Sequence, residues 1–347
     1  MSTATTTAAA TDDRVQTKSA LSVLLGMPAV GAFIGAIAIA ALFLSVAPAF
    51  RNVTNIGTIL YTCSLIGIMA VFVALLMIGG EFDLSTGVAV TASGLTAAHT
   101  AWYFNLNVWT GVFLALIFSL AIGAFNGWLL NKTGLPSFLV TLGTFFVLQG
   151  VNLAVTRIVT GGVSSNTISD MQGWSSAQAV FASEFNIGSV EIKIPVIYWL
   201  ILTGIVSFVL LRTRIGNWVL AAGGDPAAAR AVGVPVAWTK TGLFMATGFA
   251  AWLVGMHMLF EYNNIQSGQG LGNEFIYIIA AVIGGCLLTG GYGSIVGASV
   301  GALIYGMTQL GISYARWDVD WLKTFLGVML IAAVLVNMYV KRKADAR

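Results

Sequence analysis

The chain consists of long apolar runs separated by short polar or glycine-rich segments. A membrane-spanning helix needs about 20 predominantly apolar residues, and runs of that order recur along most of the sequence. The pattern predicts ten spanning segments: 27–47, 57–78, 84–98, 108–130, 136–156, 195–211, 241–260, 274–289, 292–314 and 322–340. The expected fold class is all-α, a polytopic membrane protein of about ten transmembrane helices, some short or broken.

Basic residues orient these segments, because lysine and arginine favour cytoplasmic loops. With a cytoplasmic N-terminus, ten crossings leave both termini in the cytoplasm, with an external loop at 157–194 and a cytoplasmic loop at 212–240. We therefore expect a cytoplasmic tail at 1–26 without a cleaved signal peptide, a transmembrane domain at 27–340 and a basic cytoplasmic tail at 341–347. The basic residues then on the cytoplasmic side are Arg14, Lys18, Lys132, Arg212, Arg214, Arg230, Lys240, Lys341, Arg342, Lys343 and Arg347.

The scarcity of charge excludes several classes of protein. Charged residues make up 8% of the 347 positions, against roughly 25% in an ordinary globular domain. A soluble enzyme, a disordered chain and a nucleic-acid binder are therefore excluded, and a net charge of +3 is too small and dispersed for a phosphate-binding patch. Cys63, Cys286, His99 and His257 have no metal-binding spacing, so we expect packing or hydrogen-bonding roles and no metal or cofactor.

The most unusual charges are Glu81 and Asp83, in the glycine-rich segment GGEFDLSTG at 79–87. In one interpretation Asp83 caps a helix that begins at Leu84, with Ser85 and Thr86 in its first turn. In the other, these four polar residues line a path for a polar ligand, because ionisable groups near membrane depth are costly and tend to face cavities. A proton relay is disfavoured, because no partner histidine or lysine is evident.

A second glycine-interrupted region, at 284–301, adds Thr289 and Ser294 as candidates for the same path. Paired broken helices in the two halves of a transporter often flank the substrate. The alternative is that these glycines only allow helices to cross closely.

The loop segment AAGGDPAAARAVGVP at 221–235 predicts a short cytoplasmic helix. Glycines break the chain before Asp225, which suits the N-cap, Pro226 suits the first turn, and Gly233 suits the end. A two-turn helix barely holds alone in water, which favours docking onto a partner over a plain surface helix. No phosphate-binding GxxxxGK[ST] motif is present, so ATP-driven transport would need another chain to hydrolyse ATP.

Four segments in order resemble the inner-membrane permeases of bacterial sugar ABC importers of the ribose, xylose and autoinducer-2 type. They are GGEFDLSTG, GLPSFLVTLGTFFVLQG at 134–150, AAGGDPAAARAVGV, and GNEFIYIIAAVIGGCLLTGGYGSIVGA at 272–298. The resemblance implies a type II ABC importer fold in the bacterial inner membrane, two permease subunits, identical or related, two cytoplasmic ATP-binding subunits and a periplasmic sugar-binding protein. It also implies that the ATPase-coupling residues are Gly224, Asp225, Pro226, Ala229, Arg230 and Gly233.

The sequence departs from this family pattern at three positions. Ile276 and Tyr292 are uncharged where the family commonly has an acidic and a basic residue, and Glu81 adds a charge where many members are apolar. The particular substrate therefore stays open, and a polyol, a nucleoside or an amino acid remains an alternative to a monosaccharide. An ion-coupled secondary transporter, a membrane-embedded enzyme and a structural anchor are the competing classes.

Overall fold

The computed structural model describes residues 28–345, and its side chains as far as Val336. The described chain is helical apart from one short hairpin, which confirms the expected all-α class. In chain order the elements are α2 (Pro28–Val46), η1 (Pro48–Arg51), α3 (Asn55–Ile78), α4 (Thr86–Tyr103), α5 (Val108–Thr133), α6 (Ser137–Thr160), α7 (Trp174–Phe181), β1 (Glu184–Ile187), β2 (Val190–Lys193), α8 (Ile194–Arg212), α9 (Arg214–Gly224), α10 (Pro226–Ala231), α11 (Val236–Tyr262), α12 (Asn273–Ile283), α13 (Ile295–Tyr314) and α14 (Trp321–Asp345).

Seven of the ten predicted segments form helices that are long and apolar enough to cross a membrane: α2, α3, α5, α6, α8, α11 and α13. The other three predicted segments differ from simple spans. The third begins at Thr86 and forms the buried helix α4, and the last forms α14, which is apolar over Trp321–Val336, as far as the side chains are described. The eighth is wrong as a span over 274–289, because α12 stops at Ile283, where Gly284 and Gly285 follow. An 11-residue helix rises only about 16 Å.

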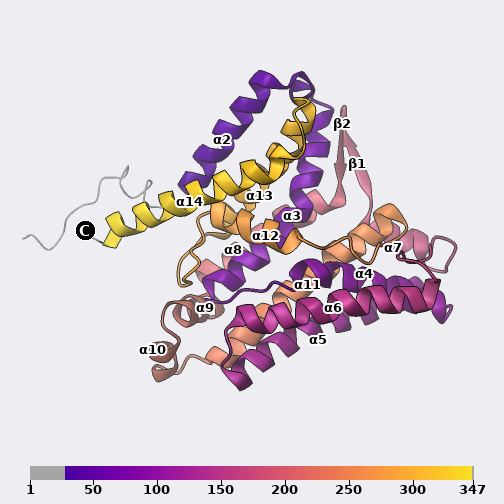
Figure 1. The fold of residues 1–347 in the computed structure, drawn as a ribbon, viewed down its shortest axis with the longest axis horizontal. Coiled ribbons are helices and arrows are strands. Elements are labelled where there is room, and N and C mark those ends of the chain that lie inside the picture. The colour runs from indigo at the N-terminus through magenta and orange to yellow at the C-terminus, as the bar shows by residue number, and fades with distance from the viewer. Residues whose placement is uncertain (1–27, 346–347) are drawn as a thin grey trace, which may run out of the picture.

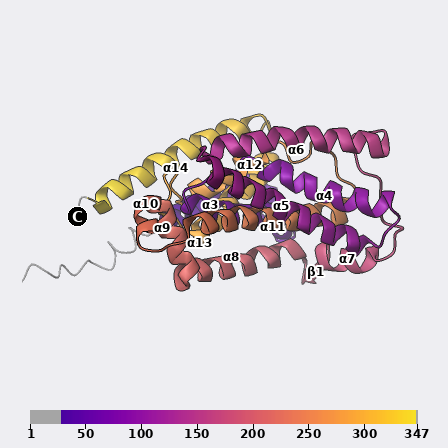
Figure 2. The same cartoon turned by 90° about the horizontal axis from the view of Figure 1, so that it is seen from below.

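Three helices form the centre of the molecule. Most of α3, α11 and α13 is buried, whereas α2, α6 and α8 are mainly exposed on the outside, as expected for surfaces that face lipid. Figure 1 shows α4, α5, α6 and α11 running side by side, with α2, α3, α13 and α14 gathered across them. Figure 2 shows α6 and α14 along one side of this body and α8 along the opposite side. The buried side chains form one main core that reaches through both groups.

The helix ends follow the sequence. Asn107 caps α5 by accepting a hydrogen bond from the Trp109 amide, and Ser294 caps α13 by accepting one from the Gly297 amide. Gly134 and Gly161, both with positive φ, end α5 and α6, since glycine enters the left-handed region without steric cost. The boundaries of the long helices are therefore encoded locally.

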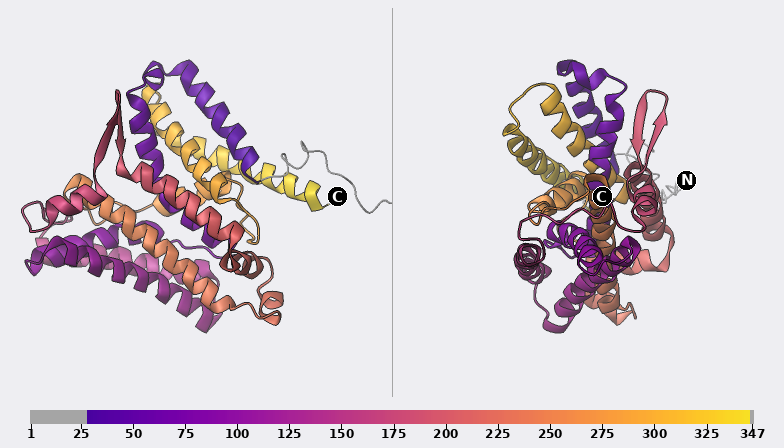
Figure 3. Two further views of the ribbon diagram at one scale, coloured as in Figure 1. Left: turned by 180° about the vertical axis from the view of Figure 1, so that it is seen from behind. Right: turned by 90° about the vertical axis from the view of Figure 1, so that its right-hand side faces the viewer.

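Helix α11 connects two dissimilar ends of the molecule. It begins just after α9 and α10, and we call that the α10 end. It ends near α7 and the β1–β2 hairpin, and we call this end of the molecule the hairpin end. Figure 3 shows the hairpin beside α3. The sequence predicted the 157–194 loop there but no structure within it. The strands pair antiparallel, with Glu184 opposite Lys193.

The hairpin end is held by contacts among four elements, α3, α7, β2 and α11. Lys193 of β2 forms an ion pair with Glu261 of α11, and its ammonium lies 5.1 Å from the centre of the Tyr61 ring. His257 hydrogen-bonds to the Phe181 carbonyl at 2.6 Å and to the Tyr61 hydroxyl at 2.9 Å. Because a carbonyl only accepts, Nδ1 of His257 carries the proton and Nε2 accepts from Tyr61. His257 therefore joins α3, α7 and α11, which agrees with the hydrogen-bonding role expected for it.

Candidate functional site

The segment between α3 and α4, residues 79–85, is the most polar buried part of the described chain. Asp83 is 4% exposed and Ser85 is fully buried. The Asp83 carboxylate accepts hydrogen bonds from the Ser85 amide at 2.8 Å and the Ser85 hydroxyl at 2.5 Å. Helix α4 begins at Thr86 with Ser85 as its N-cap residue, so the expected helix start at Leu84 is wrong by two residues. Asp83 instead fixes the turn before the helix, as aspartate does in local turns.

Helix α6 clamps the same segment. Ser137 and Thr141, one turn apart on α6, accept hydrogen bonds from the amides of Phe82 and Leu84 at 3.0 and 3.1 Å. Both amides lack a helical partner, so these hydroxyls satisfy buried donors that would otherwise be costly. The contact explains why a serine and a threonine occur among the apolar residues of the 134–150 segment.

A hydrogen-bond chain leads from Asp83 to the face of α6. Asn126 of α5 donates to the Ser85 hydroxyl at 3.1 Å and accepts from the Thr144 hydroxyl at 2.6 Å. On the other side of Asp83, Thr247 of α11 lies 3.4 Å from the second carboxylate oxygen. The network joins four elements, and its fixed hydrogen bonds make it rigid.

The cavity around this network is small. A space of about 10 Å³ is lined by Asp83, Ser85, Thr86, Ala89, Ile122, Gly123, Phe244, Thr247 and Gly248. That is about the room of one water molecule and far below the size of a sugar. Asp83, Ser85 and Thr86 are therefore gathered together as expected, but they do not face an open substrate cavity in this conformation.

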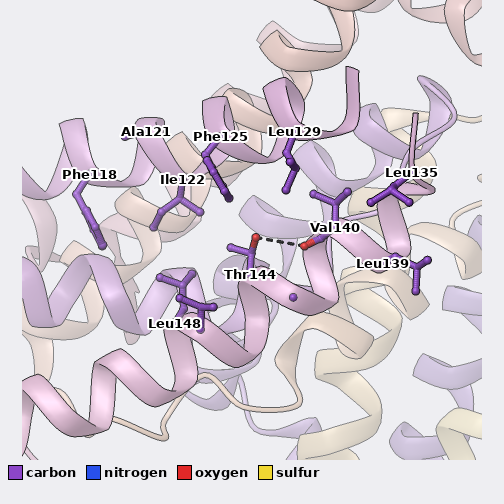
Figure 4. Close-up of a pocket in the computed structure, with 12 residues that line it drawn as sticks. Phe118, Ala121, Ile122, Phe125, Leu129, Leu135, Leu139, Val140, Thr144 and Leu148 are labelled. Atoms are coloured by element: carbon purple, nitrogen blue, oxygen red, sulfur yellow. Dashed lines mark hydrogen bonds between the residues drawn. The ribbon is translucent and has the colours of Figure 1, made fainter. Parts of the chain in front are cut away.

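A much larger cavity of about 570 Å³ lies between α5 and α6. Figure 4 shows Phe118, Phe125, Leu129 and Leu139 around it, with Thr144 at its floor bonded to the Val140 carbonyl. The lining is almost entirely apolar, so the cavity offers a sugar very few hydrogen-bonding partners. Its remaining lining residues are Ala121, Ile122, Leu135, Val140, Gly143, Val147 and Leu148.

Glu81 has a different environment from Asp83. Its carboxylate forms an ion pair with the ammonium of Lys240, in the second turn of α11. The side chains of Glu81 and Lys240 are 9% and 13% exposed. No partner for Glu81 was predicted from the sequence, because Lys240 is 159 residues away and only the fold brings the two together. Glu81 therefore points to the start of α11 and is separated in role from the Asp83 network.

Three glycine-rich segments meet beside this ion pair. The amide of Gly291 donates to the Ile78 carbonyl at 2.8 Å, which joins the α12–α13 loop to the end of α3. Gly223, at the end of α9, packs so closely on the same carbonyl that a Cβ there would collide with it. A Cβ on Gly80 would meet the Gly223 backbone at 3.2 Å. The two glycine-interrupted regions singled out in the sequence therefore touch one another and the end of α9.

Helix α10 has the caps expected from the sequence. The Asp225 carboxylate accepts from the amides of Ala227 and Ala228 at 2.9 and 3.0 Å, and Pro226 is the first helical residue. Gly233, with φ of 86°, follows the helix. Gly223 and Gly224 are the last two residues of α9, a helix that was not predicted from the sequence, and the break expected there falls at the extended residue Asp225.

The residues exposed at α10 are not all the ones that were expected to contact a partner. Ala229 is 3% exposed and packs with Ala222 and Val236, so it is unavailable to a partner in this conformation. Arg230 is exposed, and Val232 and Trp238 are exposed to 79% and 81%. Val232, directly after α10, and Trp238, in the first turn of α11, were not predicted, although large apolar residues beside a punctuated loop helix are a signal that the sequence does carry. Gly224 and Asp225 also lie on the exposed side.

Thr289 and Ser294 are not part of the Asp83 network. Thr289 is exposed, in the loop just before Gly290, and the Ser294 hydroxyl is used in capping α13. The sequence did not lead to the network members Asn126, Thr144 and Thr247, or to Ser137 and Thr141, which bind the same segment. Each is a polar residue in an otherwise apolar helix, and that contrast was the available signal.

Comparisons with known proteins identify relatives over most of the chain. A family model described as "Branched-chain amino acid transport system / permease component" matches residues 55–334. The ribose import permease protein RbsC of Escherichia coli strain K12 is 31% identical over 299 residues, covering 84% of this chain and 88% of its own length. No solved structure gives a significant match.

Two further relatives are import permeases for other sugars. The fructose import permease protein FrcC of Rhizobium meliloti is 27% identical over 297 residues, covering 85% of this chain and 81% of that protein. The D-allose transport system permease protein AlsC of Escherichia coli strain K12 is 29% identical over 308 residues, covering 88% and 90%. The family resemblance expected from the four sequence segments is confirmed.

Proposed function

This chain belongs to the permease-component family of the branched-chain amino acid transport system, and from that premise we propose that it forms the membrane pathway of an ATP-driven importer for a monosaccharide. It is a transport subunit, as its relatives are. The names of those relatives, import permeases for ribose, fructose and allose, support a sugar as the substrate. A polyol, a nucleoside or an amino acid remains the alternative, as the family's own description illustrates.

The proposed assembly contains two permease subunits, two cytoplasmic ATP-binding subunits and a periplasmic sugar-binding protein. The bacterial inner membrane, with both termini in the cytoplasm, is the proposed location. Toward the α10 end the described chain carries Lys132, Arg212, Arg214, Arg230 and Lys240, of which Lys240 is paired with Glu81. The opposite end has as many described basic residues, Arg51, Arg157, Lys193, Arg316 and Lys323, of which Lys193 is paired. The proposed orientation therefore rests on the basic residues of the two terminal segments of the sequence and on the family resemblance.

The observation that carries the proposal is the exposed surface of α10, the residue that follows it and the first turn of α11. Val232 and Trp238 offer apolar area, Arg230 offers charge, and the buried Ala229 holds the helix against the rest of the protein. An apolar and charged patch on a fixed helix suits a partner subunit better than solvent. We propose that the ATP-binding subunits dock here, through Arg230, Val232 and Trp238 together with Gly224, Asp225 and Gly233. Pro226 and Ala229 support the helix from behind.

The substrate path is proposed to pass the network of Asp83, Ser85 and Thr86 once the subunits rearrange, since hydroxyl and carboxylate groups suit a sugar. Thr289 and Ser294 remain weaker candidates, as neither belongs to that network.

Co-purification with the ATP-binding subunit tests the docking site. We expect Val232→Asp and Arg230→Glu to reduce the retained ATP-binding subunit about tenfold, because each replaces a complementary contact with an unfavourable charge. Val319→Asp is the matched control, since Val319 is 59% exposed at the hairpin end. Equal retention in Val232→Asp and Val319→Asp would place the docking surface elsewhere.

Uptake into proteoliposomes that contain the whole importer tests the substrate and the energy source. Ribose, fructose, allose and leucine are compared, with ATP inside and the proton gradient dissipated. Accumulation of one sugar under these conditions is the expected result. Uptake of leucine alone would shift the substrate class, and uptake that stops with the gradient would favour an ion-coupled transporter.

A further inference from the structure

Both flanks of α10 contact the 79–85 segment. Before α10, Gly223 at the end of α9 lies against the Ile78 carbonyl and the backbone of Gly80. After α10, Lys240 on α11 forms its ion pair with Glu81. The short helix proposed to dock the ATP-binding subunit is therefore anchored on both sides to the same buried segment.

The two contacts differ in kind. The glycine contact is between backbones, without side chains that could flex, so a displacement of the end of α9 presses directly on the end of α3. The ion pair is mostly removed from water, so separating its charges is unfavourable, and the two residues tend to move together. One contact resists compression and the other resists separation.

The far side of the segment is bound to α6. Phe82 and Leu84, the neighbours of Glu81 and Asp83, donate their amide hydrogens to Ser137 and Thr141. A shift of Glu81 is therefore passed within three residues to the first two turns of α6. Since α6 is bonded to the Asp83 network through Thr144 and Asn126, the same shift reaches the proposed substrate path.

We propose that Glu81 and Lys240 are a positioning pair that carries the movement of α10 into the 81–85 segment and from there into α6. The inference rests on the proposed function of α10 as the docking helix. It also gives a role to the charge at position 81, which departs from the pattern of the resembling permeases. Transport is driven through this pair even though neither residue touches the substrate.

The test uses the complete importer in proteoliposomes, with spin labels on Leu139→Cys of α6 and Leu200→Cys of α8. Both positions are exposed, at 51% and 60%, and Cys63 and Cys286 are buried. The label-to-label distance is measured with and without a non-hydrolysable ATP analogue. We expect a nucleotide-dependent shift with otherwise wild-type residues, its loss in Glu81→Gln and Lys240→Met, and its recovery in the double charge swap Glu81→Lys with Lys240→Glu.

Transport gives the second measurement. The measured quantity is the amount of sugar taken up per ATP hydrolysed, with the sugar that the wild type accumulates. This ratio should fall about tenfold in each single variant and recover in the charge swap. The Glu261→Gln variant is the matched control, because it breaks the ion pair at the hairpin end and should leave the shift intact. Loss of the distance change in that control would show a general structural effect and overturn the proposal.

The two proposals fail in different ways. Loss of the ATP-binding subunit from Glu81→Gln at purification would mean that the pair serves docking itself, and the relay would be overturned. The relay would also be overturned if both single variants retained the subunit and showed a normal distance shift and normal uptake. It would be overturned as well if the protein with wild-type residues at 81 and 240 showed no shift. Either result would leave the docking assignment in place. The assignment of the docking surface to α10 is tested separately, by the Val232→Asp and Arg230→Glu variants.

Discussion

The two ends of α11 are built on the same plan with different partners. Each end carries an ion pair, with Lys240 and Glu81 at the α10 end and Lys193 and Glu261 at the hairpin end. At the hairpin end, a histidine, a tyrosine and a cation–π contact surround the pair and fix a small surface structure. At the α10 end, closely packed glycine backbones surround it and contact segments from three helices. The hairpin end is therefore a fixed attachment, and the α10 end is the junction that we propose to transmit movement.

The two largest expected effects are of similar size, and the first comes from the glycine contact. Gly223→Ala would place a methyl group on the Ile78 carbonyl and 2.8 Å from the Gly291 amide nitrogen, both backbone atoms with little room to move. We expect the free energy of unfolding to fall by about 3 kcal/mol, as for overpacked sites. Gly224→Ala is the matched control, since nothing lies within 4 Å of its Cβ position. Thermal unfolding in detergent measures both, and equal stabilities would refute the close contact.

The next effect separates the two ion pairs. Glu81→Gln leaves the Lys240 ammonium mostly buried without a charged partner, and we expect a loss of about 3 kcal/mol. Glu261→Gln should cost less, about 1 kcal/mol, because the Lys193 side chain is 22% exposed and water can replace the lost charge. If Glu261→Gln lowered the free energy of unfolding more than Glu81→Gln in the same assay, the ion pair at the hairpin end would be the stronger one, contrary to this prediction.

His257 tests the attachment at the hairpin end. His257→Ala removes the donor to the Phe181 carbonyl and the acceptor for Tyr61, at a cost of about 2 kcal/mol. Hydrogen exchange should then quicken in α7 and stay unchanged in α10. Tyr61→Phe removes only one of these bonds and should have the smaller effect. Faster exchange throughout the chain would show that the end is not a separate unit.

The smallest effect concerns pH. Burial lowers the pKa of Lys193, but the hydrogen bond and charge of Glu261 outweigh it, so the pKa is raised. A raised pKa means that the pair contributes fully below the ordinary lysine value of about 10.4 and is lost only above it. The stability difference between wild type and Lys193→Met should therefore stay constant from about pH 6 to pH 9. A difference that changes within that window would show that another group controls the pair.

Much of the site was predictable because its signals are local. Asp225, Pro226 and Gly233 specify α10 through capping and backbone preferences. Asp83 and Ser85 lie two residues apart, so their hydrogen bond needed no tertiary information. The partner of Glu81 and the burial of Ala229 could not be predicted in this way, because they depend on which helices pack together.

The sequence by itself determined the membrane class, the long helices, their caps and the short helix of the 221–235 loop, because apolar length and backbone preference act within a few residues of the chain. The tertiary structure decided the contact of Ile78, Gly223 and Gly291, the pairing of Glu81 with Lys240, and the path from Asp83 to Thr144. These depend on contacts between residues that are far apart in the chain, and only the packing of the helices selects them.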